Sequence, residues 1–159
     1  LKDLDIKEAK NLAENSKDKP KLVPALARIY AQEGSEGKSK FFEENYATVG
    51  VNDKVDLIVN YASYLTMQKD DKVIDQSLVF FQKVCKETNP WWMKIMGMRA
   101  LGQIARFYAQ KEMALQSEPD AQKVVEEAVK RKNYLRELIE EIKSEEKDDR
   151  VLPYYEQIK

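Results

Sequence analysis

The sequence predicts an all-α protein built from antiparallel helix pairs. Residues 27–32 (ARIYAQ) recur 78 positions later as residues 105–110 (ARFYAQ), with five of six residues identical. Half of this interval is close to the length of one helical-hairpin repeat. The 159 residues include only 5 Gly and 5 Pro, and no useful length of chain alternates apolar and polar residues as a strand does. These three observations together favour stacked helices.

The first half of the chain contains four predicted helices. Residues 5–15 carry apolar side chains on one side, and a polar turn follows. Pro20 and Pro24 favour the start of a second helix, where a missing N–H costs nothing. Glycines at positions 34 and 37 predict a loop before a third helix, which ends near Gly50. Asn52 or Asp53 is expected to cap a fourth helix that runs to about Met67.

The second half begins with a predicted turn and cap at residues 69–71 and a fifth helix through about Cys85. Asn89 is expected to cap a sixth helix, with Pro90 at its first position and its end near Met113. This helix is apolar on nearly all sides, as a central helix is. Close approach of a neighbouring helix would explain its two glycines, Gly97 and Gly102, each of which costs about 1 kcal/mol relative to Ala.

A long seventh helix, capped by Ser117, is expected to extend to about Lys147. Its apolar residues follow three- and four-residue steps, as in a coiled-coil seam. The seam is expected either to cover the end of the stack or to mediate self-association through residues 120–147. A short terminal segment from Val151 is expected to be helical.

Composition limits the function classes. The 27 basic and 28 acidic residues give a net charge of −1, so no strong field attracts nucleic acid. No apolar run approaches the roughly 18 residues of a membrane-spanning helix. Histidine is absent, and the single cysteine, Cys85, lies on an apolar stripe. We therefore expect a buried, inert thiol, with no catalytic residue, metal site or cofactor in this chain.

Two tryptophans and two arginines are the candidate partner contacts. On a helix, the adjacent residues Trp91 and Trp92 would point about 100° apart and could not face the same partner. Each is expected either to pack in the core or to serve as an exposed anchor for a partner. Arg28 and Arg106 hold matching positions in the repeated segment. A salt bridge to the neighbouring repeat and a contact with a partner are the two roles that we consider for them.

The segment at residues 98–104 (MRALGQI) resembles the second-helix signature of HEAT repeats, in which an arginine and small residues precede Leu-Gly and an aliphatic residue. The resemblance implies a HEAT-like α-α superhelix of antiparallel helix pairs with a long C-terminal helix. One helical-repeat domain would then occupy residues 1–159. Because the chain begins with Leu1 and not Met, we expect this domain to be excised from a longer protein.

Scattered matches at residues 22–31, 40–43 and 89–92 resemble the C-terminal helical-repeat domain of bacterial zinc metallopeptidases of the aminopeptidase N family. In that family the repeat domain packs against the catalytic domain and limits peptide access. The catalytic His-Glu-x-x-His signature is absent, so no catalytic or metal-binding residue carries over. Zinc is expected only in a catalytic domain outside this chain. The resemblance implies a periplasmic or cell-envelope location, and without it a cytoplasmic one is expected.

The leading interpretation is a non-catalytic accessory domain that packs on a zinc aminopeptidase catalytic domain and shapes peptide access. The concave side of the fourth and sixth predicted helices is the expected contact surface. The partner would be the catalytic domain of the same polypeptide or another protein. A free-standing protein–protein interaction scaffold is the alternative. A small enzyme that uses paired carboxylates, such as residues 43–44, 126–127 or 140–141, is a third class.

Overall fold

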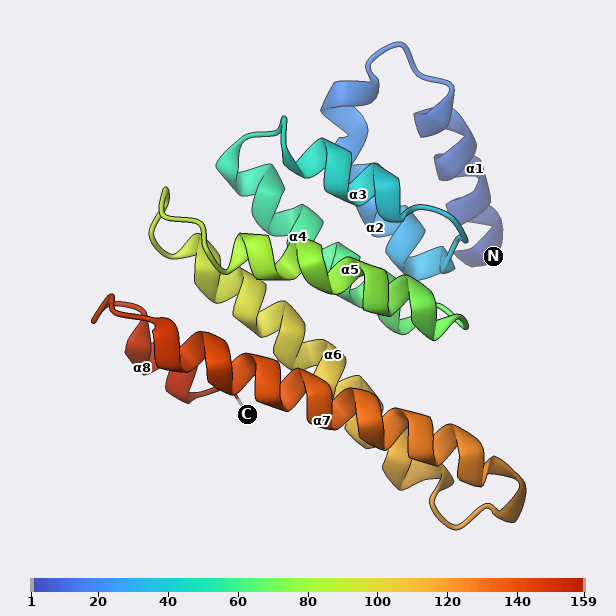
Figure 1. Ribbon diagram of the computed structural model, residues 1–159. Helices are drawn as coiled ribbons and strands as arrows, with labels where there is room; N and C mark the ends of the chain where they lie inside the picture. The colour runs from blue at the N-terminus through green and yellow to red at the C-terminus, as the bar shows by residue number, and fades with distance from the viewer. Residues whose placement is uncertain (1, 159) are drawn as a thin grey trace. The chain divides into compact units, whose positions relative to one another are not determined.

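The computed structural model describes the backbone of residues 2–158 and the side chains of residues 6–158 (Figure 1). Within this part of the chain there are eight α-helices and no strand, which confirms the all-α prediction. The chain divides into two compact units, residues 1–80 and 81–159. Each unit contains one copy of the repeated segment, on α2 in the first and on α6 in the second.

The first unit is built around α2, which packs against both α1 and α4, while α3 packs against α4. Pro24 lies in the first turn of α2, as predicted, where a proline loses no helical hydrogen bond. Pro20 instead lies in the separate 3₁₀ turn η1 that precedes this helix. The elements are α1 (Lys2–Glu14), the 3₁₀ turn η1 (Lys19–Leu22), α2 (Val23–Glu33), α3 (Ser39–Tyr46) and α4 (Val51–Thr66).

Aromatic rings form the centre of this unit. The Phe42 ring stacks on Tyr61, with ring centroids 4.8 Å apart and planes 3° from parallel, and Tyr64 lies 5.1 Å from Phe42. All three side chains are buried. The Tyr61 hydroxyl donates a 2.6 Å hydrogen bond to Glu43. Burial, together with this bond, raises the pKa of Tyr61, so a neutral phenol is held at the edge of the core.

The loop after α2 has the glycine geometry that the sequence predicts. Gly34 and Gly37 adopt φ values of +68° and +72°, a region that residues with a Cβ enter only at a cost. The Gly34 N–H donates a 2.9 Å bond to the Tyr30 carbonyl and so ends α2.

The second unit consists mainly of two long helices that lie side by side in Figure 1, α6 and α7. A shorter helix, α8, contacts both of them. Because most of α6 is apolar, it buries residues on several sides, including Leu101 and Ile104. The helices that complete the chain are α5 (Asp71–Val84), which spans the boundary between the units, α6 (Met93–Leu115), the 3₁₀ turn η2 (Pro119–Ala121), α7 (Gln122–Glu145) and α8 (Leu152–Glu156).

The seam predicted on α7 is used inside this unit. Ala128, Leu135 and Ile139 are buried on α7, which packs against α6. Lys132, the polar residue in the seam, forms an ion pair with Glu112 of α6. The apolar stripe therefore covers α6, and its charged member has a partner on that helix.

Both glycines of α6 mark a close approach, as predicted. A Cβ built on Gly97 would lie 3.0 Å from the Cys85 backbone nitrogen and from its sulfur. A Cβ on Gly102 would lie 3.0 Å from Ile158, beyond the end of α8. Such contacts are tighter than a Cβ normally makes, and the Cys85 backbone has little freedom to move. The packing of α6 therefore outweighs the lower helix propensity of glycine.

Three predicted helix starts are wrong. The fourth helix begins at Val51, before Asn52 and Asp53, and the Gly50 carbonyl accepts its first bond from Lys54. The seventh begins at Gln122, after η2, with no side-chain cap from Ser117. The sixth begins at Met93, three residues after Pro90, which was expected at its first position. At all three ends no side chain caps the helix, so residues with a capping preference did not mark the boundaries.

Residues 89–92 form a non-helical turn before α6 and are not part of the helix itself. The Asn89–Pro90 peptide bond is cis, and the Met93 N–H donates a 3.1 Å bond to the Pro90 carbonyl. Trp91 lies in this turn, and Trp92 is the N-cap residue of α6. Asn89 and Pro90 are thus outside the helix that they were expected to start.

The two copies of the repeated segment have nearly the same pattern of burial. Ala27 and Ala105 are both buried, as are Tyr30 and Tyr108. Within its unit, the helix that carries the segment packs against a long neighbour, α4 for α2 and α7 for α6. In addition, no helix described by the structure is both long and apolar enough to cross a membrane.

Candidate functional site

A surface pocket in the second unit contains both tryptophans of the chain. Its cavity volume is about 250 Å³. Ile95 is buried, whereas the two indoles are only partly buried and Tyr154 is 43% exposed. The pocket is lined by Trp91, Trp92, Ile95, Met96 and Arg99 from the start of α6 and the turn before it, and by Tyr154 from α8.

The prediction that Trp91 and Trp92 cannot face the same partner is wrong. The 100° rotation between neighbours holds only when both residues lie within a helix. Here Trp91 belongs to the turn that precedes α6, so the 100° rotation per helical residue does not set the direction of its side chain. Both indoles line one pocket as a result.

Arg99 lines this pocket, and a second arginine contacts one of its tryptophans. Arg150 stands over the Trp91 ring, with its guanidinium carbon 4.7 Å from the ring centroid. Asp148 holds Arg150 through two hydrogen bonds, from Nε at 3.1 Å and from Nη2 at 2.9 Å. These bonds hold the pKa of Asp148 below its ordinary value. Arg99 is exposed and has no ion pair with any residue that the structure describes.

Sequence reasoning found the tryptophans but missed three other members of this surface. Arg99, Arg150 and Tyr154 come from α6, from the segment after α7, and from α8. Only the position of Arg99 could have been predicted from the local sequence. It is seven residues, or two helical turns, after Trp92 and therefore lies on the same face of the helix. Nothing in the sequence places residues 150 and 154 beside Trp91.

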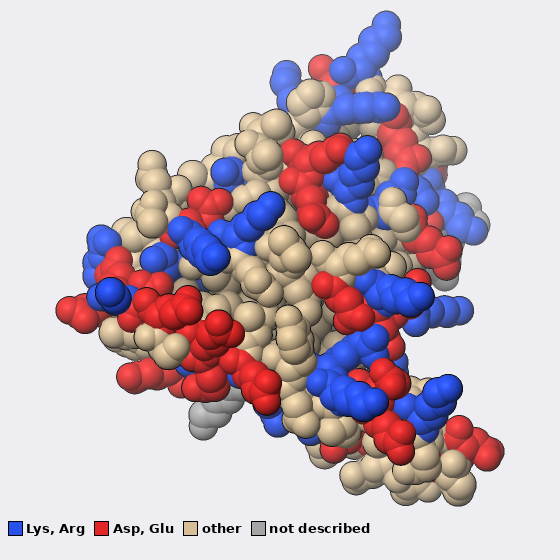
Figure 2. Space-filling model, viewed as in Figure 1, with Lys and Arg blue, Asp and Glu red and all other residues tan. Residues whose placement is uncertain are grey.

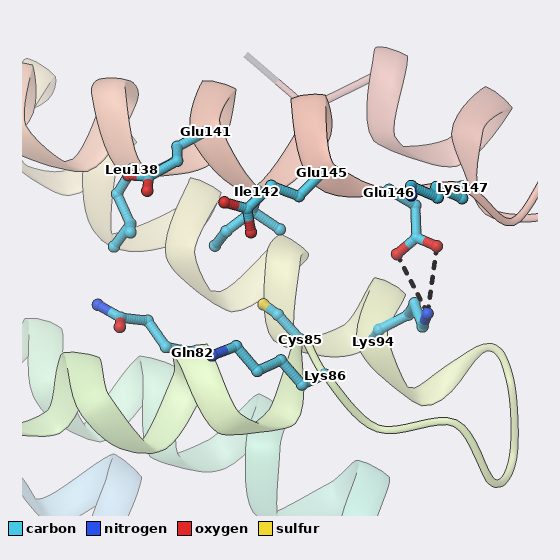
Figure 3. Close-up of a pocket in the computed structure, with 10 residues that line it drawn as sticks. All are labelled: Gln82, Cys85, Lys86, Lys94, Leu138, Glu141, Ile142, Glu145, Glu146 and Lys147. Carbon is cyan, nitrogen blue, oxygen red and sulfur yellow. Dashed lines mark hydrogen bonds and ion pairs between the residues drawn. The ribbon is translucent and has the colours of Figure 1, made fainter.

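A second cavity of about 390 Å³ lies in the same unit (Figure 3). The Cys85 sulfur points into it, and α7 supplies Leu138, Glu141, Ile142 and Glu145 from the opposite side. Lys94 of α6 and Glu146 form an ion pair at one end, drawn as dashed lines in Figure 3. Lys86 and Lys147 also line the cavity, so charges of both signs surround it.

The Lys94–Glu146 pair is nearly buried. Lys94 Nζ lies 3.2 Å from Oε1 and 3.1 Å from Oε2 of Glu146, and the two side chains are 11% and 9% exposed. The Asp148 N–H donates a further 3.0 Å bond to Oε1 of Glu146. The pair ties the start of α6 to the segment that follows α7.

The thiol in this cavity is held in its protonated form. Burial raises the pKa of Cys85 to about 12; the negative charge of Glu146 adds to this rise and Lys94 opposes it. A buried thiol was expected from the apolar stripe, and its burial is confirmed. At neutral pH Cys85 supplies almost no thiolate, the form that attacks electrophiles and binds metals.

We expect Cys85 to react slowly in the folded protein. Relative to the unfolded chain, the raised pKa lowers the thiolate fraction at about pH 8 by roughly a thousandfold, and burial also blocks access. An aromatic disulfide reagent at that pH should therefore label the native chain at least about a hundredfold more slowly than the urea-unfolded chain. Equal labelling rates would show that the cavity opens readily around the sulfur.

A third cavity, of about 360 Å³, lies in the first unit. The Tyr30 hydroxyl donates a 2.8 Å bond to Glu14 at its wall, and Val23, Leu26 and Phe41 supply apolar surface. Burial, with the bond to Glu14, raises the pKa of Tyr30. A neutral phenol with a carboxylate partner supplies no activated base, and the other polar residues of the lining are Lys19, Asn45 and Thr48.

Neither of the two repeated arginines is among the residues that line these cavities. Arg28 and Arg106 are both exposed, and neither forms a salt bridge with a residue that the structure describes. The expected ion pair to a neighbouring repeat is therefore absent in that part of the chain. Their side chains are free to meet solvent, because each lies on the outward side of its helix.

The described residues contain no group of three or more His, Cys, Asp or Glu side chains that could hold a metal ion. On the face shown in Figure 2, acidic and basic side chains are interspersed, in agreement with the small net charge. Comparison of the chain with protein-family models, curated proteins and solved structures gave no match in any of the three.

Proposed function

We propose that this chain is a non-catalytic helical domain that binds a protein partner through the pocket formed by Trp91, Trp92, Ile95, Met96, Arg99 and Tyr154, hereafter the tryptophan pocket. The observation that carries the proposal is the convergence of both tryptophans on one surface pocket. Large aromatic side chains are costly to leave in water, and those that stay partly exposed in one place are typical of interaction surfaces.

The size and composition of the tryptophan pocket favour a protein partner over a small molecule. Its 250 Å³ is below the roughly 300 Å³ at which ligand pockets usually begin, and is enough for one or two side chains. Trp, Tyr and Arg are the residues that most often dominate the binding energy of protein interfaces. The tryptophan pocket contains all three, together with a methionine that can adapt its shape.

The family resemblance gives this proposal its more specific form. We propose that the partner is the catalytic domain of a zinc aminopeptidase, on which this domain would pack and shape peptide access. The support is the set of short sequence matches at residues 22–31, 40–43 and 89–92 and the all-helical fold. A free-standing interaction scaffold is the alternative, and the same tryptophan pocket would then receive a separate protein.

Site-directed photo-crosslinking tests the proposal. A photoreactive phenylalanine analogue at position 154 should form one major adduct in cells, and mass spectrometry should identify the crosslinked peptide. The adduct should disappear in Trp92→Ala and persist in Tyr134→Ala, because Tyr134 is an exposed tyrosine of α7 outside the tryptophan pocket. A peptide from a domain with the His-Glu-x-x-His motif would support the aminopeptidase form. Failure to obtain any Trp92-dependent adduct would contradict the proposal.

A further inference from the structure

We propose that the tryptophan pocket receives an acidic segment of its partner, with one large apolar side chain seated between the indoles and a carboxylate beside Arg99. This inference rests on the proposed function and adds the chemistry of the occupant. It concerns residues of the second unit alone.

The apolar part of the occupant follows from the floor and walls of the tryptophan pocket. Ile95 is buried at its base, and Met96 and the two indoles are partly buried around it. A single leucine- or phenylalanine-sized side chain would remove this surface from water, at about 25 cal/mol for each Å² of apolar area buried. A fully polar segment would leave it hydrated and would gain little.

The acidic part follows from the charges around the same pocket. Arg99 is exposed and has no ion pair with a described residue, so it is available to a carboxylate. Arg150 lies over Trp91 and presents a second guanidinium there, although Asp148 already neutralises part of its charge. Of the described residues that line the tryptophan pocket, none is acidic.

The backbone adds a second, independent preference for negative charge. The tryptophan pocket lies over the first two turns of α6, a helix of 23 residues. The N-terminal end of a helix carries a partial positive charge, which favours an anion nearby, and this holds here although the Met93 and Ile95 N–H groups already donate to the Pro90 and Trp92 carbonyls. A basic segment would be repelled by Arg99 and by this helix end, whereas Arg150 is already paired with Asp148.

The chain contains a built-in reporter for testing this inference. It has only two tryptophans, and both line the tryptophan pocket, so tryptophan emission responds to occupancy of that site. The experiment is a selection of random nine-residue peptides displayed on phage against the intact chain, followed by fluorescence titration of the enriched peptides. Peptides of the proposed class should share one large apolar residue and an excess of Asp and Glu.

Two variants distinguish the contributions of the indole and the charge. Trp92→Ala should weaken binding of these peptides at least about tenfold, because it removes one wall of the tryptophan pocket. Arg99→Glu should weaken acidic peptides by about tenfold or more and improve their lysine-substituted counterparts. Tyr134→Ala, an exposed site on α7 outside the tryptophan pocket, should leave both affinities unchanged.

The outcomes distinguish the claim that the occupant is acidic from the wider claim that the tryptophan pocket binds a protein. Enriched peptides that depend on Trp92 but carry neutral or basic residues would overturn the acidic occupant and leave the interaction function standing. Affinities insensitive to Arg99→Glu would do the same. Selection that yields no Trp92-dependent peptide would overturn the peptide-binding inference, while the crosslinking experiment on position 154 judges the wider function separately.

Discussion

Replacement of Lys94 by alanine is expected to lower the free energy of unfolding by about 3 kcal/mol, near the lower end of the range for breaking a buried ion pair. Glu146, only 9% exposed, would lose its cationic partner and two hydrogen bonds, retaining the bond from the Asp148 N–H. We expect a loss near the lower end of that free-energy range because both side chains border a cavity and keep about a tenth of their surface exposed to solvent. Urea denaturation monitored by circular dichroism measures the change.

The matched control is an ion pair on the surface. Lys40 and Glu44 on α3 lie 3.6 Å apart and are 84% and 66% exposed. Lys40→Ala should change the free energy of unfolding by no more than about 0.5 kcal/mol, because water screens the pair. The double variant Lys94→Met/Glu146→Leu should recover most of the loss, since it leaves no unpaired charge. A Lys94→Ala effect as small as that of Lys40→Ala would contradict the burial of the pair.

Leu101→Ala is the second substitution with a large expected effect, a loss of about 2–5 kcal/mol. The Leu101 side chain is fully buried, with 0% of its surface exposed, and lies at the middle of α6. The loss combines the transfer free energy of the removed methyl groups with the cavity that they leave. Denaturant unfolding of the intact chain gives the magnitude.

The control for Leu101 lies on the same helix. Met113 is 72% exposed near the end of α6, so Met113→Ala removes a large apolar side chain without creating a cavity. Its effect should stay within about 0.5 kcal/mol. If Leu101→Ala cost less than about 1 kcal/mol, the placement of α6 at the centre of the unit would be wrong.

Helix number, helix order and the main breaks followed from local sequence signals. Periodic apolar residues predicted the helices from α1 to α8, and the glycines at 34 and 37 predicted the loop that ends α2. Those signals are local, because a helical period and a residue able to adopt positive φ act within a few positions. The HEAT-like arrangement of the helices depends on how helix pairs stack and stays a prediction.

Only part of the candidate site could be predicted from the sequence. Trp91 and Trp92 were candidate partner contacts because they are large aromatic residues. Their shared pocket depends on a turn that was predicted to be the first turn of a helix. Tyr154, which lines this pocket, and Arg150, which lies over the Trp91 ring, come from far along the chain. No periodic pattern connects residues 50 or more positions apart, so only packing reveals such neighbours.

The sequence by itself determined the all-helical class and the burial of Cys85. Each depends on side-chain type and helical spacing along one element, which the chain encodes locally. Tertiary structure alone decided that the α7 seam covers α6, that Lys94 pairs with Glu146, and that both tryptophans line one pocket. Those outcomes depend on which elements meet, and that choice is made by the summed packing and charge of the whole unit rather than by any short segment.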